Sequence, residues 1–289
     1  MKTRSKIFIA GVLSKLITLI VSKNQTVIRN KIKWNLDLNE GIDLSVYLFG
    51  TSEKKIKNLN KLLPKKEGPI IVIDIGANIG SVSLVLAKMI DKVKIFAIEP
   101  TIYAYDKLSN NLKLNKDLIN KVFLRQLFIS DQKKPEKVWS SWSLQKSGEK
   151  HKKHLGTLKD IKKNSYITLD KFITMEKLQK VDFIKLDVDG HELDVLKSGQ
   201  EFFLNNKPII FIEIAPYLYS EFGYNYQELI EFIIKLNYDF YDENIKKVKN
   251  FFNLVEKIKD GSSKNFYLIQ RFGEVYNIGG GRYSNCSIS

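Results

Sequence analysis

The sequence has little cysteine: Cys286 is the only one among 289 residues. A single cysteine excludes an internal disulfide and a zinc site built from cysteine pairs, and it favours a reducing, cytoplasmic location. An ordinary membrane span is lacking too. The apolar run Ile7–Val21 is short and is interrupted by Ser14, Lys15 and Thr18. With 44% hydrophobic residues, the chain can nevertheless bury a core of enzyme size.

Arginine is also scarce, since only five of the 47 basic residues are arginine. Base and phosphate recognition favours the bidentate guanidinium group. The lysine excess behind the net charge of +15 therefore indicates compositional bias more than a nucleic-acid partner. The charge is uneven as well: residues 1–36 carry eight basic side chains and no acid, which supplies +8 of the total.

Residues 1–36 form a basic, apolar N-terminal segment whose role stays open. Ser14, Thr18 and Ser22 recur at four-residue spacing and would form a polar stripe on an otherwise apolar helix. Such a helix can lie peripherally on an anionic membrane surface. It can equally pack on its own domain or on a second copy in a homo-oligomer. Secretion is less well supported, because Val21-Ser22-Lys23 makes a poor cleavage site.

The strongest motif is the stretch 70–80, IIVIDIGANIG, with an acid at Glu99. The β-branched run before Asp74 is typical of a strand that is buried on both faces, and a glycine turn follows it. A second apolar run, Val93–Ile98, ends at Glu99. A glycine turn followed by an acid at the end of the next strand is typical of nucleoside binding, with the carboxylate accepting ribose hydroxyls.

Departures from the dinucleotide fingerprint decide which nucleoside is expected. Asn78 and Ser81 stand where that fingerprint has its second and third glycines, and the later glycine is Gly80. The Asn78 side chain would crowd a pyrophosphate, and Asp74 adds negative charge. A cofactor that carries ammonium and sulfonium groups suits both features, so the sequence favours S-adenosylmethionine over a dinucleotide or an empty tight turn.

The rest of the chain alternates strands and helices in the way that builds a parallel sheet. Residues Gln132–Ser165 are polar and lysine-rich and are expected to form a long solvated excursion, and residues 272–289 a loose tail. The further elements expected are strands Val122–Ile129, Val181–Val188 and Pro208–Ile214, helices Ser81–Ile90, Glu192–Ser198 and Tyr226–Leu236, strand Tyr238–Tyr241, a basic hairpin, and strand Phe266–Arg271.

A second motif, DFIKLDVDGHE, occupies residues 182–192. Because side chains alternate along a strand, Lys185 and Asp187 share one face and are expected to pair. Asp189, His191 and Glu192 follow at the carboxyl end, where ligands bind in open α/β sheets. A buried ion pair followed by a helix cap explains the same residues without chemistry, so both interpretations stand.

Two weaker features lie in the excursion. His151 and His154 have the spacing of some metal pairs, but the lysines around them favour a solvated segment. Trp139 and Trp142 either attach a long loop to the domain or form a platform on which a sugar stacks.

These motifs together resemble the FkbM family of S-adenosylmethionine-dependent methyltransferases. The resemblance covers about residues 37–271. It is carried by Asp43–Glu53, Val72–Gly80, Ile98-Glu99-Pro100, Ile129–Asp131, Ile167–Asp170, Asp182–Glu192 and Ile212-Glu213, in this order.

The resemblance implies the α/β fold of class I methyltransferases, a Rossmann-like, mostly parallel sheet of seven strands with helices on both faces and the last strand antiparallel. It also implies methylation of a hydroxyl on a sugar, glycan or small secondary metabolite. A nucleic-acid methyltransferase or binding protein of the same fold is the alternative. The implied cofactor contacts are the methionine part at Asp74, Gly76, Asn78 and Gly80, the ribose at Glu99, the adenine edge at Asp131, and closure of the site by Glu53.

The expected reaction is in-line displacement at the sulfonium methyl, which needs positioning and a base for the hydroxyl proton. Candidate bases are Asp187, His191, Asp189 and Glu213, of which the first two are preferred, and Lys185 would hold Asp187. The role of His191 is inferred from its position alone. The carboxylates suit hydrogen bonding at strand ends, so no metal is assigned.

Overall fold

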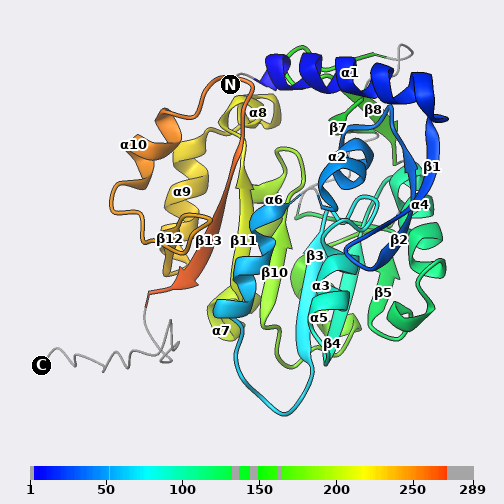
Figure 1. The fold of residues 1–289 in the computed structure, drawn as a ribbon. Helices are drawn as coiled ribbons and strands as arrows, with labels where there is room; N and C mark the ends of the chain where they lie inside the picture. Colours follow the sequence, from blue (N-terminus) through cyan, green and yellow to red (C-terminus); the bar gives the residue numbers. More distant parts are fainter. Residues whose placement is uncertain (1–2, 52, 132–136, 144–148, 162–164, 272–289) are drawn as a thin grey trace, which may run out of the picture.

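The computed structural model describes residues 3–51, 53–131, 137–143, 149–161 and 165–271. The predicted sheet is confirmed: seven strands run in the order β12-β13-β11-β10-β3-β4-β5, and only β13 is antiparallel to its neighbours (Figure 1). The strands are β3 (Ile70–Ile75), β4 (Val93–Ile98), β5 (Val122–Arg125), β10 (Phe183–Leu186), β11 (Ile209–Ile214), β12 (Tyr238–Tyr241) and β13 (Lys264–Gln270).

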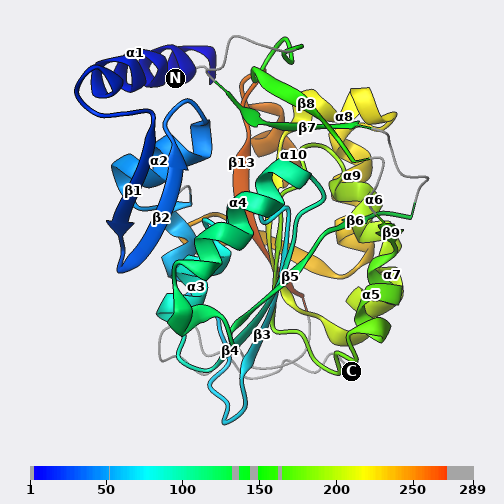
Figure 2. The same cartoon turned by 90° about the vertical axis from the view of Figure 1, so that its right-hand side faces the viewer.

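Helices cover both faces of this sheet, as the α/β class requires (Figure 2). The first apolar cluster packs α5 (Leu169–Met175), α6 (Glu192–Ser198), α7 (Gln200–Asn206), α8 (Pro216–Tyr219), η3 (Ser220–Phe222), α9 (Tyr226–Lys235) and α10 (Phe251–Glu256) on one face. The second packs α2 (Gly41–Phe49), η1 (Lys54–Lys61), α3 (Ser83–Met89), α4 (Ile102–Lys113) and η2 (Lys116–Leu118) on the other. Alternate residues of each central strand join opposite clusters, which is why these strands are apolar throughout.

The register of the central strands determines the site. Lys185 of β10 lies directly beside Asp74 of β3, and both strands end at the same edge of the sheet. Parallel strands present their carboxyl ends together, so the two motifs found in the sequence meet at that edge.

The third predicted strand, Val122–Ile129, is wrong as a single element. The structure divides it into β5 and β6 (Leu127–Ile129), and β6 leaves the sheet to pair with β9 (Ser165–Ile167). The predicted basic hairpin after β12 contains helix α10. Both differences come from partners that are distant in the sequence, which local periodicity does not reveal.

The excursion after β6 is more ordered than its composition predicts. Its described residues form an antiparallel pair, β7 (Lys137–Trp142) and β8 (Gly156–Asp160). Val138 and Ile161 pack with Phe128 in a small apolar cluster. This pair covers the carboxyl-end edge of the main sheet, and therefore contributes to the site.

The N-terminal segment comprises α1 (Thr3–Ile20), β1 (Asn24–Arg29) and β2 (Ile32–Asp37). Trp34 and its alternate neighbours on β2 are fully buried in the second cluster, whereas α1 lies across the carboxyl-end edge of the sheet (Figure 1). Within the described ranges, no helix has both the length and the apolar character to cross a bilayer. The predicted tail, 272–289, lies outside the described residues.

Candidate active site

A cavity of about 560 Å³ opens at the carboxyl ends of β3, β4, β10 and β11. Most of the side chains that the sequence singled out line it. On the predicted cofactor side these are Glu53, Asp74, Gly76, Asn78 and Glu99, and on the predicted catalytic side Lys185, Asp187, Asp189 and Glu213.

The turn after β3 approaches the neighbouring strand closely. Gly76 has φ +84°, and a Cβ there would lie 1.8 Å from the carbonyl oxygen of Asp187. Asn78 also has a positive φ, 50°, and its backbone N–H donates to Glu99 Oε2 at 3.0 Å. The turn of the first motif therefore packs directly against the backbone of the second motif. This contact leaves no room for a side chain at position 76.

Glu99 is held on both oxygens. Its Oε1 accepts hydrogen bonds from the backbone N–H and hydroxyl of Thr101, at 2.9 and 2.6 Å. Burial raises the pKa of Glu99 although these bonds oppose the rise. A carboxylate has about four lone-pair positions, so Glu99 keeps acceptor capacity toward the cavity.

Asp74 is fully buried at the end of β3. Its Oδ2 accepts a hydrogen bond from Ser83 Oγ at 2.6 Å, while Oδ1 has no hydrogen-bond partner among the described residues. Burial raises the pKa of Asp74, and the attraction of Lys185 opposes that rise. An unsatisfied buried carboxylate oxygen in the cavity wall is a ready acceptor for a ligand.

Lys185 supplies the positive charge in this wall. It is 4% exposed and pairs with Asp187 at 2.6 Å. Burial alone would lower the pKa of Lys185, but attraction to Asp187, Asp74 and Glu53 outweighs it and the pKa is raised. The predicted pair is confirmed, and Lys185 stays protonated at any working pH.

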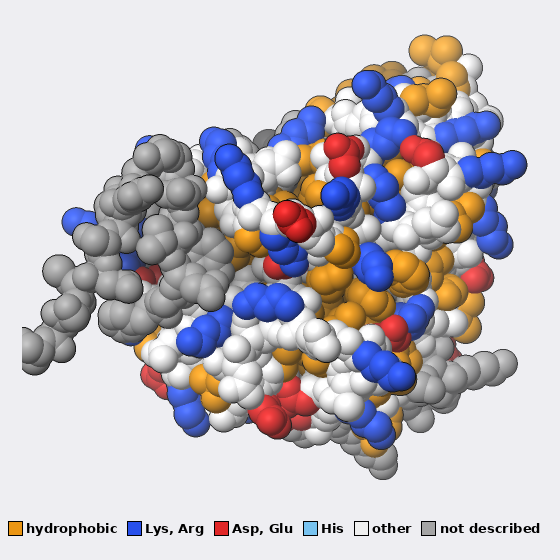
Figure 3. All heavy atoms as spheres, turned by 90° about the horizontal axis from the view of Figure 1, so that it is seen from below, with side chains coloured by type: hydrophobic (Ala, Val, Ile, Leu, Met, Phe, Trp, Pro, Cys, Tyr) orange, Lys and Arg blue, Asp and Glu red, His pale blue; other side chains and the backbone are white. Residues whose placement is uncertain are grey.

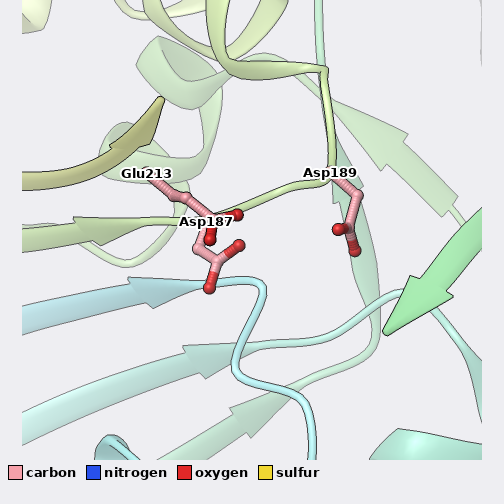
Figure 4. A group of neighbouring side chains, drawn as sticks. All are labelled: Asp187, Asp189 and Glu213. Carbon is pink, nitrogen blue, oxygen red and sulfur yellow. The ribbon is translucent and has the colours of Figure 1, made fainter. Parts of the chain in front are cut away.

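Three carboxylates gather at the ends of β10 and β11 (Figure 4). Asp187, Asp189 and Glu213 each offer an oxygen, and these oxygens lie within 4.8 Å of one another. Burial, followed by repulsion from Asp187, raises the pKa values of Asp189 and Glu213 well above their usual range. Such a cluster can accept protons and hydroxyl hydrogen bonds, and its spacing also suits a cation.

Three predicted site residues are not among those that line the cavity. Gly80 has φ +89° and packs so closely on Leu108 of α4 that a Cβ would lie 2.5 Å from it. Asp131 is exposed just after β6. His191 is buried between Phe128 and Phe222, with Nδ1 3.2 Å from Asp194 Oδ2. The geometry thus gives these three a structural or peripheral place.

The expectation of a solvated histidine pair is wrong. His151 and His154 are 4% and 6% exposed, and their rings stack with centroids 4.0 Å apart. Trp139 meets both rings edge to face, and Tyr217 lies against them from α8. Trp139, His154 and Tyr217 line the cavity, whereas the Trp142 side chain lies outside the described residues. We call these three lining residues the aromatic wall.

His154 is neutral and holds its proton on Nε2. Burial, helped by His151, lowers the pKa of His154 to about 4. Nδ1 accepts a hydrogen bond from the backbone N–H of Gly156 at 3.1 Å, which leaves the proton on Nε2. Nε2 has no hydrogen-bond partner within the described part of the chain, so the wall contains an unused donor.

Comparison with known proteins decides the family. The profile of the methyltransferase FkbM domain matches residues 74–240, which is more than half of the chain. The chain belongs to the FkbM methyltransferase family. The match contains residues 74–80 of the first motif, Glu99, the whole second motif and the sheet edge on which the cavity opens.

Individual relatives of this FkbM protein are distant. It is 28% identical over 158 residues to the methyltransferase sdnD of Sordaria araneosa, a match that spans 45% of this chain and 60% of that protein. A crystal structure of an FkbM methyltransferase from Methylobacillus flagellatus superposes with a TM-score of 0.45 at 18% identity, over 72% of this chain and 45% of that one. The human methyltransferase 10 domain containing protein gives a TM-score of 0.48 at 10% identity, over 92% and 96%.

Proposed function

We propose that this protein transfers the methyl group of S-adenosylmethionine to a hydroxyl of a sugar, glycan or small polar metabolite. The observation that carries the proposal is the juxtaposition, in one cavity, of the Gly76–Glu99 nucleoside turn with the carboxylates of Asp187, Asp189 and Glu213.

The donor side fits this cofactor. When bound, S-adenosylmethionine supplies an electrophilic methyl group on a sulfonium. Glu99 would accept the ribose hydroxyls through its free lone pairs, and Gly76 leaves the backbone open to close approach. Asp74, with its unpartnered buried oxygen, would attract the positively charged methionine part.

On the acceptor side, we assign the base to the Asp189–Glu213 pair. Asp187 is held in an ion pair by Lys185, so the pair with raised pKa values is better matched to removing a hydroxyl proton near neutral pH. Ser263 donates to Glu213 Oε1 at 2.6 Å and orients that carboxyl group. The departing proton would pass to this pair as the oxygen attacks in line.

The aromatic wall favours a sugar-like acceptor. Trp139 and Tyr217 offer apolar surface to the C–H face of a ring. A cluster of three carboxylates repels phosphate groups. An uncharged polyhydroxyl acceptor is therefore favoured over a nucleic acid.

The test is transfer of a radiolabelled methyl group from S-adenosylmethionine to panels of glycans, small hydroxyl metabolites, RNA and DNA. Transfer to a hydroxyl compound supports the proposal. With that acceptor, Asp189→Asn and Glu213→Gln are each expected to lower kcat by about 100-fold, and Asp106→Asn, an exposed carboxylate on α4, to leave it unchanged. Salt-sensitive transfer to nucleic acid alone would overturn the proposal. Loss of transfer on chelation would reassign the carboxylates to a metal.

The titration of Glu53 provides a separate prediction about the donor. Burial raises the pKa of Glu53 to about 7, with Lys185 opposing. Below that pH Glu53 is neutral, and above it the carboxylate attracts a cationic cofactor. From about pH 6 to pH 8, the affinity for S-adenosylmethionine is therefore expected to rise up to about tenfold.

Calorimetry measures this pH dependence. The Glu53→Gln variant should bind equally at both pH values, apart from the titration of the cofactor's own amine. The pH dependence that remains in Glu53→Gln gives the contribution of the amine, which is subtracted from that of the wild type. A wild-type affinity that does not change between the two pH values would contradict the assignment.

A further inference from the structure

Helix α1 exposes its apolar face to solvent, whereas a helix that packs on a domain ordinarily buries that face. Its large apolar side chains point to solvent, with exposed fractions from 40% at Leu13 to 87% at Ile20. We call them the outer face of α1: Phe8, Ile9, Val12, Leu13, Leu16, Leu19 and Ile20. At 3.6 residues per turn these seven positions fall within an arc of about 140°.

The side of α1 that faces the domain contains fewer large apolar residues than the outer face. Ser14 is 2% exposed and donates its hydroxyl to the carbonyl of Leu38 at 2.9 Å. Its less exposed neighbours on this side are Ala10, Gly11, Ile17 and Thr18, followed by Val21 just after the helix. Ser14 and Thr18 of the predicted polar stripe therefore lie on the packed side, whereas Ser22 is exposed just after the helix. A surface helix ordinarily buries its apolar face, so the exposed apolar face of α1 indicates an external partner.

Neighbouring elements also expose apolar side chains. Ile28 of β1 is 68% exposed and Phe49 of α2 is 56% exposed, and α2 packs against both α1 and β1. At the opposite end of the molecule, apolar side chains lie among lysine, arginine and acidic ones (Figure 3). On α1, by contrast, the exposed apolar side chains share one face of a single helix.

Charge identifies the partner. Residues 1–36 carry eight basic side chains and no acid, and Lys15, Lys23, Lys31 and Lys33 are exposed. Two copies joined through this segment would bring two charges of +8 together, whereas an anionic bilayer surface complements them. We propose that α1 docks the protein on an anionic membrane, with its outer face in the lipid interface.

Docking in this way would place the cavity beside the bilayer. Ala10 of α1 and Leu48 and Phe49 of α2 all line the cavity. The membrane would therefore lie at its rim. The inference does not depend on the proposed acceptor.

Flotation of the full chain with vesicles tests the proposal. Binding to phosphatidylcholine–phosphatidylglycerol vesicles is expected to exceed binding to phosphatidylcholine alone, and to weaken as salt is raised. Leu16→Glu/Leu19→Glu should lower the partition coefficient at least about tenfold. Met175→Glu/Leu204→Glu introduces the same charges at exposed positions of α5 and α7 and should not change it.

Two further measurements decide between outcomes. Lys15→Gln/Lys23→Gln should weaken binding to the anionic vesicles only. Calorimetry with S-adenosylmethionine shows whether each variant retains its fold. Equal loss of vesicle binding in the α1 and control variants would overturn the proposal. So would a wild-type dimer that ignores vesicles and becomes a monomer with Leu16→Glu/Leu19→Glu, because the surface would then join two copies.

Discussion

An alanine at position 76 is expected to abolish cofactor binding and to lower the free energy of unfolding by about 3 kcal/mol or more. Two causes combine. The residue has φ +84°, which costs a side chain about 1–2 kcal/mol. In addition, the new Cβ would lie 1.8 Å from the carbonyl oxygen of Asp187, which is backbone and has no rotamer to change. The turn and the end of β10 must separate, and both belong to the site.

Gly223→Ala is a matched control for this substitution. Gly223 has φ +78°, but no atom lies within 4 Å of its added Cβ. The free energy of unfolding of this variant should fall by only about 1 kcal/mol, the cost of the positive φ, and its affinity for S-adenosylmethionine should be retained. Denaturant unfolding and calorimetry measure both quantities. Similar losses in the two variants would show that backbone conformation, and not contact between the two motifs, governs position 76.

The central sheet could be predicted from the sequence because its strands are buried on both faces. Val93–Ile98 and Tyr238–Tyr241 have the bounds that their apolar runs predicted, and helix Glu192–Ser198 likewise. Two acidic motifs at strand ends then had to meet, since parallel strands share one carboxyl edge. The pairing of Lys185 with Asp187 followed from alternation along a single strand.

The parts that could not be predicted depend on contacts between distant segments. Strand β6 separates from β5 because it pairs with β9, nearly forty residues later in the chain. His154 reaches the cavity only through the β7–β8 pair. The lysines near it in the sequence indicated a solvated segment instead. His191 is enclosed by Phe128 and Phe222, which its own motif does not contain. Local patterns identify elements and strand ends, but not which loop covers them.

Replacing Lys185 by methionine is expected to lower the free energy of unfolding by about 3–5 kcal/mol at pH 8, and by much less at pH 5. Methionine fills a similar volume, so the loss is mainly that of the charge. Attraction by Lys185 lowers the pKa values of Asp74 and Glu53. Without Lys185, the pKa values of these buried carboxyl groups would rise further.

The direction of the pH dependence follows from linkage. A carboxyl group whose pKa is raised on folding is tolerated while it is protonated, and it destabilises the fold as the pH rises through the folded value. Lys185 itself stays charged throughout this range, because its pKa is raised. The difference between wild type and Lys185→Met should therefore grow with pH. Urea unfolding at several pH values measures it.

Lys88→Met serves as the matched control for the loss of a lysine. Lys88 pairs with Asp117 at the same N–O distance, 2.6 Å, but Asp117 is 59% exposed. Exposed pairs contribute under about 1 kcal/mol, so this variant should lose little at any pH. If Lys185→Met lost equally little at pH 8, water would already screen the carboxylates at the ends of β3 and β10. The raised pKa values on which the assignment of the base depends would then be wrong as well.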